Sequence, residues 1–127
     1  MSDIAFKEVH SDNRRCIHSN ADLLNGAEIS LIRLYKGKAI GGCWHTKDEH
    51  FVVWKGTMTV VVRNGNEESR RVYREGMSGT FPKGHSHAMI AHEDCLASEW
   101  GITSEEKCLD QKDPVLRAEV DAINKAV

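Results

Sequence analysis

The sequence predicts an all-β fold with one C-terminal helix, and three observations lead to this class. Short apolar or alternating runs recur through the middle of the chain, separated by turns rich in glycine, asparagine and proline. Hydrophobic residues form 40% of the 127 residues, which suits a packed domain and argues against a disordered chain. Near the C-terminus the apolar residues change to a helical spacing.

The first predicted strands precede a strong hairpin turn. Glu28–Tyr35 combines β-branched and aromatic residues with partial alternation, which favours a strand. The pair Gly41-Gly42 then interrupts the pattern. Two apolar runs typical of buried strands follow, at Phe51–Trp54 and Thr57–Arg63. Asn64-Gly65-Asn66 predicts a hairpin turn after them, because asparagine and glycine tolerate positive φ.

Four more strands are predicted after this hairpin, separated by turns at Glu75-Gly76 and Glu93-Asp94. They are Arg70–Arg74, Gly79–Phe81, Ala88–Ala91 and Leu96–Ile102. Many short strands at regular spacing are typical of a β-sandwich or barrel. We therefore expect a single domain over residues 1–127, with its barrel core at about 28–102.

The C-terminal helix is predicted from about Pro114 to Lys125. Asp113 supplies an N-cap side chain, and proline suits the first helical position. Apolar residues then recur at spacings of four, three and four, at Leu116, Val120, Ile123 and Val127. We expect this helix to be a structural clip that packs on the barrel or on a partner chain.

Charge and composition exclude several classes of protein. Seventeen basic and nineteen acidic residues give a net charge of −2, which argues against nucleic-acid binding. No apolar run approaches the roughly 20 residues that span a bilayer, and the N-terminus lacks the apolar core of a signal peptide. We expect a cytoplasmic protein without membrane contact, with free thiols at Cys16, Cys43, Cys95 and Cys108.

Two histidine-containing segments suggest where the chemistry lies. In the first, alternation along a strand places Cys43 and His45 on one face, and Glu49 returns to that face if the chain bends tightly. In the second, His85 and His87 share a face after a Pro-Lys-Gly turn. A thiol, an imidazole and a carboxylate are costly to bury together, and a bound cation would offset that cost.

These segments resemble the two motifs of the cupin superfamily, whose members are small double-stranded β-helix (jelly-roll) barrels. The first motif is matched, in order, by His45, Glu49 and Gly56. The second is matched by Gly76, Pro82, Gly84 and His87. The motifs cover about residues 42–91, and flanking strands extend the resemblance to roughly 28–102. The resemblance implies an all-β jelly-roll cupin barrel, here followed by a C-terminal α-helix.

The resemblance also implies a metal site formed by His45, Glu49 and His87. The chain departs from the family pattern at Cys43, where the first motif has a histidine, and at Ala91, where the second has an asparagine. The implied cofactor is a divalent transition metal: zinc, nickel, iron, manganese or copper.

Three ways of completing this metal site stay open. A Cys43 thiolate would complete it and would favour zinc, nickel, copper or iron over a hard cation. His85 would otherwise replace the missing imidazole, or three protein ligands would hold the ion with water in the remaining positions. The alternative to all three is a metal-free barrel whose inward polar residues only bind a ligand.

The implied site predicts a metal-dependent enzyme that acts on a small polar metabolite. The cation would act as a Lewis acid on a carbonyl or carboxylate, with His85 as general acid or base near neutral pH. We expect an isomerase, epimerase or lyase acting on a sugar or an oxo or hydroxy acid. The alternatives are an iron-dependent dioxygenase and a non-catalytic cupin that binds a small ligand.

A homodimer is the expected assembly, because small single-barrel cupins commonly dimerise and because this chain has spare apolar residues. The surface predicted for the contact consists of Trp54 on a strand together with Leu116, Val120 and Ile123 on the helix.

Overall fold

The structure is a computed structural model that describes residues 7–24, 27–102 and 111–126. Its elements are β1 (Lys7–Ser11), β2 (Arg15–Leu24), β3 (Ala27–Leu34), β4 (Ala39–Trp44), β5 (Glu49–Lys55), β6 (Met58–Asn64), β7 (Glu67–Tyr73), β8 (Ser78–Phe81), β9 (Ser86–Ala91), β10 (Cys95–Trp100), β11 (Gln111–Lys112) and the helix α2 (Pro114–Lys125). Within these ranges no helix has the length and apolarity needed to cross a membrane.

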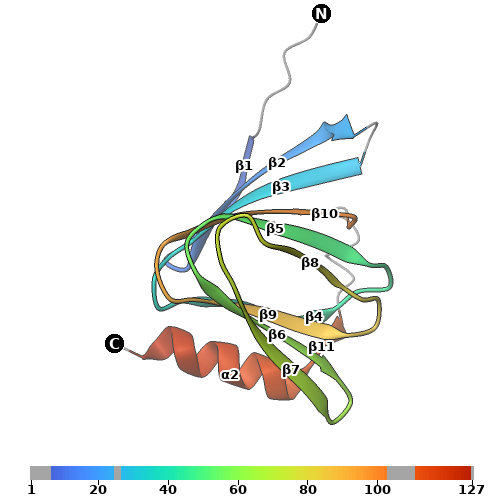
Figure 1. Ribbon diagram of the computed structural model, residues 1–127, viewed down its shortest axis with the longest axis vertical. Helices are drawn as coiled ribbons and strands as arrows, with labels where there is room; N and C mark the ends of the chain where they lie inside the picture. Colours follow the sequence, from blue (N-terminus) through green and yellow to red (C-terminus); the bar gives the residue numbers. More distant parts are fainter. Residues whose placement is uncertain (1–6, 25–26, 103–110, 127) are drawn as a thin grey trace, which may run out of the picture.

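The strands form two antiparallel sheets that face each other (Figure 1). Sheet A has the order β1-β2-β3-β10-β5-β8, and sheet B has the order β11-β4-β9-β6-β7. The helix lies against sheet B, on the side away from sheet A. This arrangement confirms the predicted all-β class, a jelly-roll barrel followed by a C-terminal α-helix.

The hairpin predicted at Asn64-Gly65-Asn66 joins β6 to β7, and Gly65 adopts a positive φ of 63°. The partner strand begins at Glu67 rather than at Arg70. Sequence alternation missed its first residues because they are polar and exposed on an edge strand.

Strands β1, β2 and β11 are additions that the sequence pattern did not predict. Only the end of β4 was expected, from the alternation at Cys43, and the strand runs through Gly41-Gly42, where an interruption was predicted. In β2, the side chains of Arg15, Ile17 and Ser19 line a cavity. Because two of these three inward positions are polar, the strand lacks the apolar alternation that marks a half-buried strand. Sheet A therefore includes two strands that precede residue 27, β1 and β2.

The main core lies between the two sheets and is built from both. Phe51 and Phe81 stack with their ring centroids 4.6 Å apart, and Tyr73 meets Phe51 edge-on at 4.9 Å. Val53 and Met58 have no exposed surface. Complete burial of such side chains is worth about 1.5–3 kcal/mol each, so this layer holds the two sheets together.

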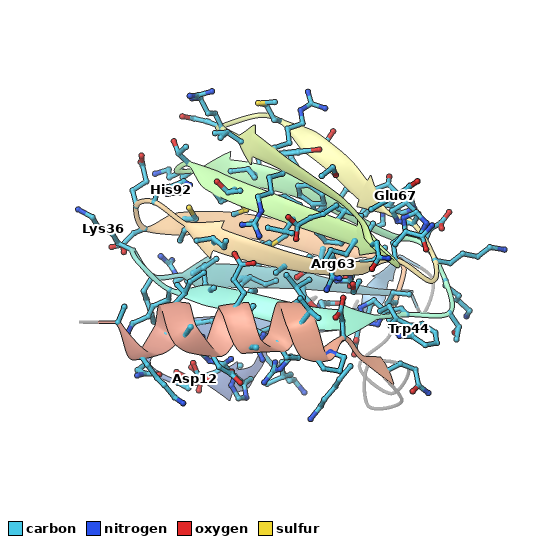
Figure 2. All side chains as sticks on the ribbon, turned by 90° about the horizontal axis from the view of Figure 1, so that it is seen from below. Asp12, Lys36, Trp44, Arg63, Glu67 and His92 are labelled. Carbon is cyan, nitrogen blue, oxygen red and sulfur yellow. The ribbon has the colours of Figure 1, made fainter. Side chains whose placement is uncertain are left out.

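The helix α2 packs its predicted apolar stripe on the outer face of sheet B. Leu116 and Val120 are buried against Ala39, Val61 and Ala88. Figure 2 shows the helix running along β4, whose end is marked by Trp44. Its predicted bounds are confirmed; Val127 lies outside the described residues.

This packing changes the surface expected for dimerisation. Leu116 and Val120 are buried within their own chain. Trp54 is 51% exposed, and its indole N–H donates a hydrogen bond to the Ser98 hydroxyl at 2.7 Å. Homodimerisation stays a prediction, and of the residues proposed for it Trp54 presents the most exposed side chain.

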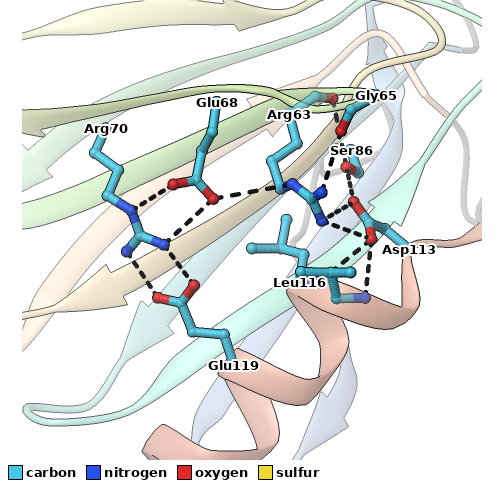
Figure 3. Close-up of polar contacts among 9 residues, drawn as sticks. Arg63, Gly65, Glu68, Arg70, Ser86, Asp113, Leu116 and Glu119 are labelled. Carbon is cyan, nitrogen blue, oxygen red and sulfur yellow. Dashed lines mark hydrogen bonds and ion pairs between the residues drawn. The ribbon is translucent and has the colours of Figure 1, made fainter.

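Polar contacts fix the start of α2 on the sheet (Figure 3). The Asp113 carboxylate accepts hydrogen bonds from the backbone N–H groups of Val115 and Leu116, as predicted for an N-cap. It also accepts from Arg63 Nη1 at 3.0 Å and from the Ser86 hydroxyl at 2.6 Å. These contacts join the helix to β6 and to the first residue of β9.

Candidate metal centre

The connections between strands bring the two histidine segments together. The chain turns between β4 and β5, and this turn contains His45 and Asp48. The backbone N–H of Gly84 donates to the His45 carbonyl at 2.8 Å, and that of Lys83 donates to Asp48 Oδ1 at 2.8 Å. The turn that precedes β9 is therefore tied to the turn that precedes β5.

Three of the predicted ligand side chains converge in the barrel. His45 comes from the β4–β5 turn, Glu49 from β5 in sheet A and His87 from β9 in sheet B. Glu49 Oε1 lies 3.6 Å from His45 Nε2 and 3.4 Å from His87 Nε2. The three residues are 9%, 1% and 8% exposed, in that order.

This arrangement fits a divalent cation. Metal bonds of about 2.0–2.2 Å place neighbouring donor atoms about 3.0–3.5 Å apart in tetrahedral or octahedral geometry. The two nitrogen-to-oxygen distances lie close to that range, and one donor atom from each residue falls within 4.8 Å of the others. Imidazole nitrogen and carboxylate oxygen are also ligands that first-row transition metals accept.

Aromatic packing holds the His87 ring in place. The ring stacks on Phe81 with centroids 3.9 Å apart and planes 5° from parallel, and it tilts against His45 at 5.0 Å. Its Nδ1 atom is buried and has no hydrogen-bond partner among the described residues. Metal-binding histidines commonly donate this second N–H to an acceptor. In this chain the stacking on Phe81 orients the ring so that Nε2 points toward Glu49.

Cys43 and His85, the other predicted site residues, lie outside this group. Cys43 lines the same cavity, and its backbone is in register with His87, but its sulfur is not among the clustered donor atoms. His85 lies in the turn before β9, and its backbone N–H donates to the Pro82 carbonyl at 3.1 Å. His85 is not one of the described residues that line the cavity. The roles of both residues stay predictions.

The three residues face a cavity of about 580 Å³, a size typical of small-molecule sites. Ile17, Ile40, Phe81 and Met89 supply apolar walls. The charged side chains of the described lining are mainly basic: Arg14, Arg15, Lys112 and Arg117, with the carboxylates Glu49 and Glu99.

Sequence reasoning missed Arg15 and Arg117 as lining residues. Arg15 belongs to a strand that was not predicted. Arg117 lies on α2 beside the apolar stripe, where a basic side chain resembles an ordinary solvated residue. The helix, expected to be only a clip, therefore contributes a side chain to the cavity.

A second group of metal-ligand side chains lies apart from the cavity. Cys16 Sγ is 3.3 Å from Glu8 Oε1 and 3.8 Å from His18 Nδ1. Cys16 and His18 alternate with Arg15 and Ile17, so they occupy the other face of β2. The hydrogen bond to Glu8, followed by burial, raises the pKa of the Cys16 thiol. Any measurement of bound metal must separate this group from the buried one.

The described cysteines agree with the expectation of free thiols. Cys16, Cys43 and Cys95 are not in disulfides, and Cys108 lies outside the described residues.

In a comparison with protein families, the chain matches the Cupin family over residues 11–116. A comparison with curated proteins found no match. Solved structures with a similar fold include a tryptophan variant of oxalate decarboxylase from B. subtilis, with a TM-score of 0.71, 14% identity, and coverage of 87% of this chain and 30% of that one.

Two further solved structures resemble the chain. The capsular polysaccharide assembling protein CapF from Staphylococcus aureus gives a TM-score of 0.66 and 19% identity, covering 89% of this chain and 34% of that one. The hydroxypropylphosphonic acid epoxidase from S. wedmorenis gives a TM-score of 0.64 and 10% identity, covering 76% of this chain and 55% of that one. The chain therefore spans about a third of the first two proteins, and these likenesses concern the fold alone.

Proposed function

The chain belongs to the cupin family, and from this premise we propose that it binds a divalent transition metal and acts as a metal-dependent enzyme on a small polar metabolite. The observation that supports the proposal is a carboxylate, only 1% exposed, whose Oε1 faces two imidazole nitrogens at 3.4 and 3.6 Å. A carboxylate buried so deeply is costly unless a cation compensates its charge.

The proposed reaction is an isomerisation, epimerisation or elimination on a sugar or an oxo or hydroxy acid. The bound metal would supply Lewis acidity toward an oxygen of the substrate. His45, Glu49 and His87 would hold it, and the stacked ring of Phe81 would keep the His87 nitrogen in position. The apolar walls at Ile40 and Met89 would limit water around the reacting atoms.

Proton transfer in this reaction is assigned to His85, as the sequence predicts. His85 precedes β9 and is not among the described lining residues, whereas Cys43 lines the cavity, so Cys43 is the competing candidate. A pH–rate profile of the His85→Gln and Cys43→Ser variants would separate them, since only loss of the true acid or base removes one limb of the profile.

Metal content tests the proposal. Protein expressed with ample zinc, nickel, iron, manganese and copper should retain about one ion per chain at the buried site after gel filtration. The His87→Ala and Glu49→Gln variants should lose this ion, because each removes a ligand. Cys16→Ser is the matched control, since it disrupts only the second group of ligand-type residues. Wild-type protein without metal, or a His87→Ala variant that keeps it, would contradict the proposal.

An iron-dependent dioxygenase is the second candidate, and one observation favours it. Two histidines and one carboxylate, with further coordination positions open, form the ligand set typical of non-haem iron oxygenases. Iron-loaded protein would then consume oxygen with substrate, whereas zinc-loaded protein would not. If zinc-loaded protein under anaerobic conditions turned over substrate as fast as iron-loaded protein in air, this candidate would be excluded. Ligand binding without any turnover would instead indicate a binding protein.

A further inference from the structure

We propose that the cavity binds a small organic anion. Arg15 and Arg117 would hold its carboxylate or phosphate group at a subsite beside His45, Glu49 and His87. The inference deepens the proposed function, because it names the class of substrate presented to the metal. It depends on different residues from those that would hold the ion, so the two can fail separately.

The charges along the cavity favour an anion. Arg14 is already paired with Asp12, whose Oδ2 accepts from Arg14 Nη2 at 2.9 Å. This contact holds the pKa of Asp12 well below its usual range. Arg117 Nη2 lies 3.7 Å from Asp121 Oδ1, but both side chains of this pair are partly exposed, so it offsets the charge of Arg117 only weakly. Arg15, Lys112 and Arg117 are the other positive groups of the described lining.

Arg15 lines the cavity, and its guanidinium is not fully hydrogen-bonded among the described residues. Its Nε atom is buried without a hydrogen-bond partner among the described residues. Burial first, and then the positive charge of Arg14, lower the pKa of this guanidinium, while Asp12 and then Glu99 act in the opposite direction. A half-buried guanidinium beside two other arginines is stabilised when an anion enters and accepts its N–H groups.

Arg117 reaches the cavity from α2 across β4. Its Nη1 donates to the Gly41 carbonyl at 3.0 Å, and its aliphatic stem lies over Gly42. A Cβ added at Gly42 would lie 2.5 Å from the Arg117 Cδ, so glycine makes room for this side chain. A guanidinium has five N–H donors. The contact with Gly41 uses one on Nη1, and Nη2 lies 3.7 Å from Asp121 Oδ1, which is beyond hydrogen-bond distance.

Two guanidinium groups favour an anion over a neutral sugar. Arginine only donates, and its planar fork matches the paired oxygens of a carboxylate or a phosphate. A neutral polyol would also need acceptors to receive its hydroxyl protons. If Arg15 served only to compensate the charge of Glu99, the cavity would show no preference for anions, and this difference makes the inference testable.

The test is calorimetric titration of metal-free and zinc-loaded protein with malonate, with inorganic phosphate and with malonamide, the neutral counterpart of malonate. The metal-free protein isolates the arginines from coordination to the ion. We expect malonate or phosphate to bind at least tenfold more tightly than malonamide in both forms, and the tighter of the two anions identifies the preferred group.

Substitutions at the two arginines test which residues cause the preference for anions. Arg15→Met and Arg117→Met should each lower anion affinity at least tenfold, and Arg15→Lys should lower it less, because it keeps the charge but loses the fork. Arg33→Met is the control, since Arg33 is exposed on β3 and outside the cavity lining. Circular dichroism of each variant checks that it folds.

The outcomes separate this inference from the proposed function. Equal binding of malonate, phosphate and malonamide by metal-free wild-type protein, or an equal loss in Arg33→Met, would overturn the anion subsite even if the zinc content is unchanged. Preference for an anion in protein that binds no metal would support the subsite while contradicting the metal centre.

Discussion

His87 Nε2 lies 3.4 Å from Glu49 Oε1, and these two residues belong to opposite sheets of the barrel. Glu49 begins β5 of sheet A, whereas His87 lies in β9 of sheet B. A cation between them would therefore join the two sheets as well as supply chemistry. The polar site and the hydrophobic layer beside it share the ring of Phe81, which contacts both Phe51 and His87.

Loss of the helix cap should destabilise the fold. Asp113→Ala removes the hydrogen bonds to the first turn of α2 and leaves the Arg63 charge without this partner. We expect the free energy of unfolding to fall by about 2 kcal/mol, measured by urea denaturation. Glu119→Gln is the control, because its partner Arg70 is 42% exposed. A pair so exposed contributes less than about 1 kcal/mol, so an equal loss in both variants would contradict the assignment.

The free energy of unfolding should also depend on pH through Asp113. Burial opposes ionisation of Asp113, but hydrogen bonds from Ser86 and Leu116 and the charge of Arg63 prevail and lower its pKa below 3.8. The unfolded chain therefore takes up this proton first as the pH falls. The stabilisation is complete above the ordinary pKa of Asp113 and is lost as the pH falls through the lower, folded value.

Asp113→Asn isolates this effect, because asparagine still caps a helix but cannot ionise. The difference in free energy of unfolding between wild type and this variant should shrink between pH 6 and pH 3. A difference that stays constant over this range would show that the Asp113 charge does not contribute.

Gly42 should be required for the position of Arg117. Gly42→Ala places a side chain on a backbone with φ of 99° and forces Arg117 aside. We expect destabilisation of roughly 1–2 kcal/mol from the backbone alone and a loss of anion affinity in the malonate titration. Gly65→Ala is a matched control, since its φ is 63° but nothing lies within 4 Å of an added Cβ. Unchanged malonate affinity in Gly42→Ala would contradict the role of Arg117.

Cobalt substitution should decide how the metal site is completed. Because the Cys43 sulfur lies outside the clustered donor atoms, the cobalt-loaded protein should lack the near-ultraviolet band of a thiolate bound to the metal. Cys43→Ser and His85→Gln should both retain more metal than His87→Ala. A thiolate band that disappears in Cys43→Ser would instead show that Cys43 is a ligand.

The parts of the fold that were predictable follow from local chemistry. The Asp113-Pro114 pair and the stripe from Leu116 onward define α2 in sequence and structure alike. Apart from β4, which runs through Gly41-Gly42, the strands from β3 to β10 agree to within a few residues, because apolar alternation directly reflects burial. The residues His45, Glu49 and His87 were predictable as a group through two motifs whose spacing matches a known family.

The parts that were missed depend on contacts between distant residues. Arg15 and Arg117 come from the two ends of the chain, and nothing in their local sequence indicates that they line one cavity. Alternation placed Cys43 on the same face as His45, and both do line the cavity. It did not reveal that the sulfur falls outside the donor cluster, because a shared face does not fix the distance between individual side-chain atoms.

The most direct test of the metal centre is a crystal structure of zinc-loaded protein with anomalous scattering recorded at the zinc edge. We predict one strong anomalous peak bonded to His45 Nε2, His87 Nε2 and a Glu49 carboxylate oxygen. An absence of density at that point, or a peak found only beside Glu8, Cys16 and His18, would contradict this prediction.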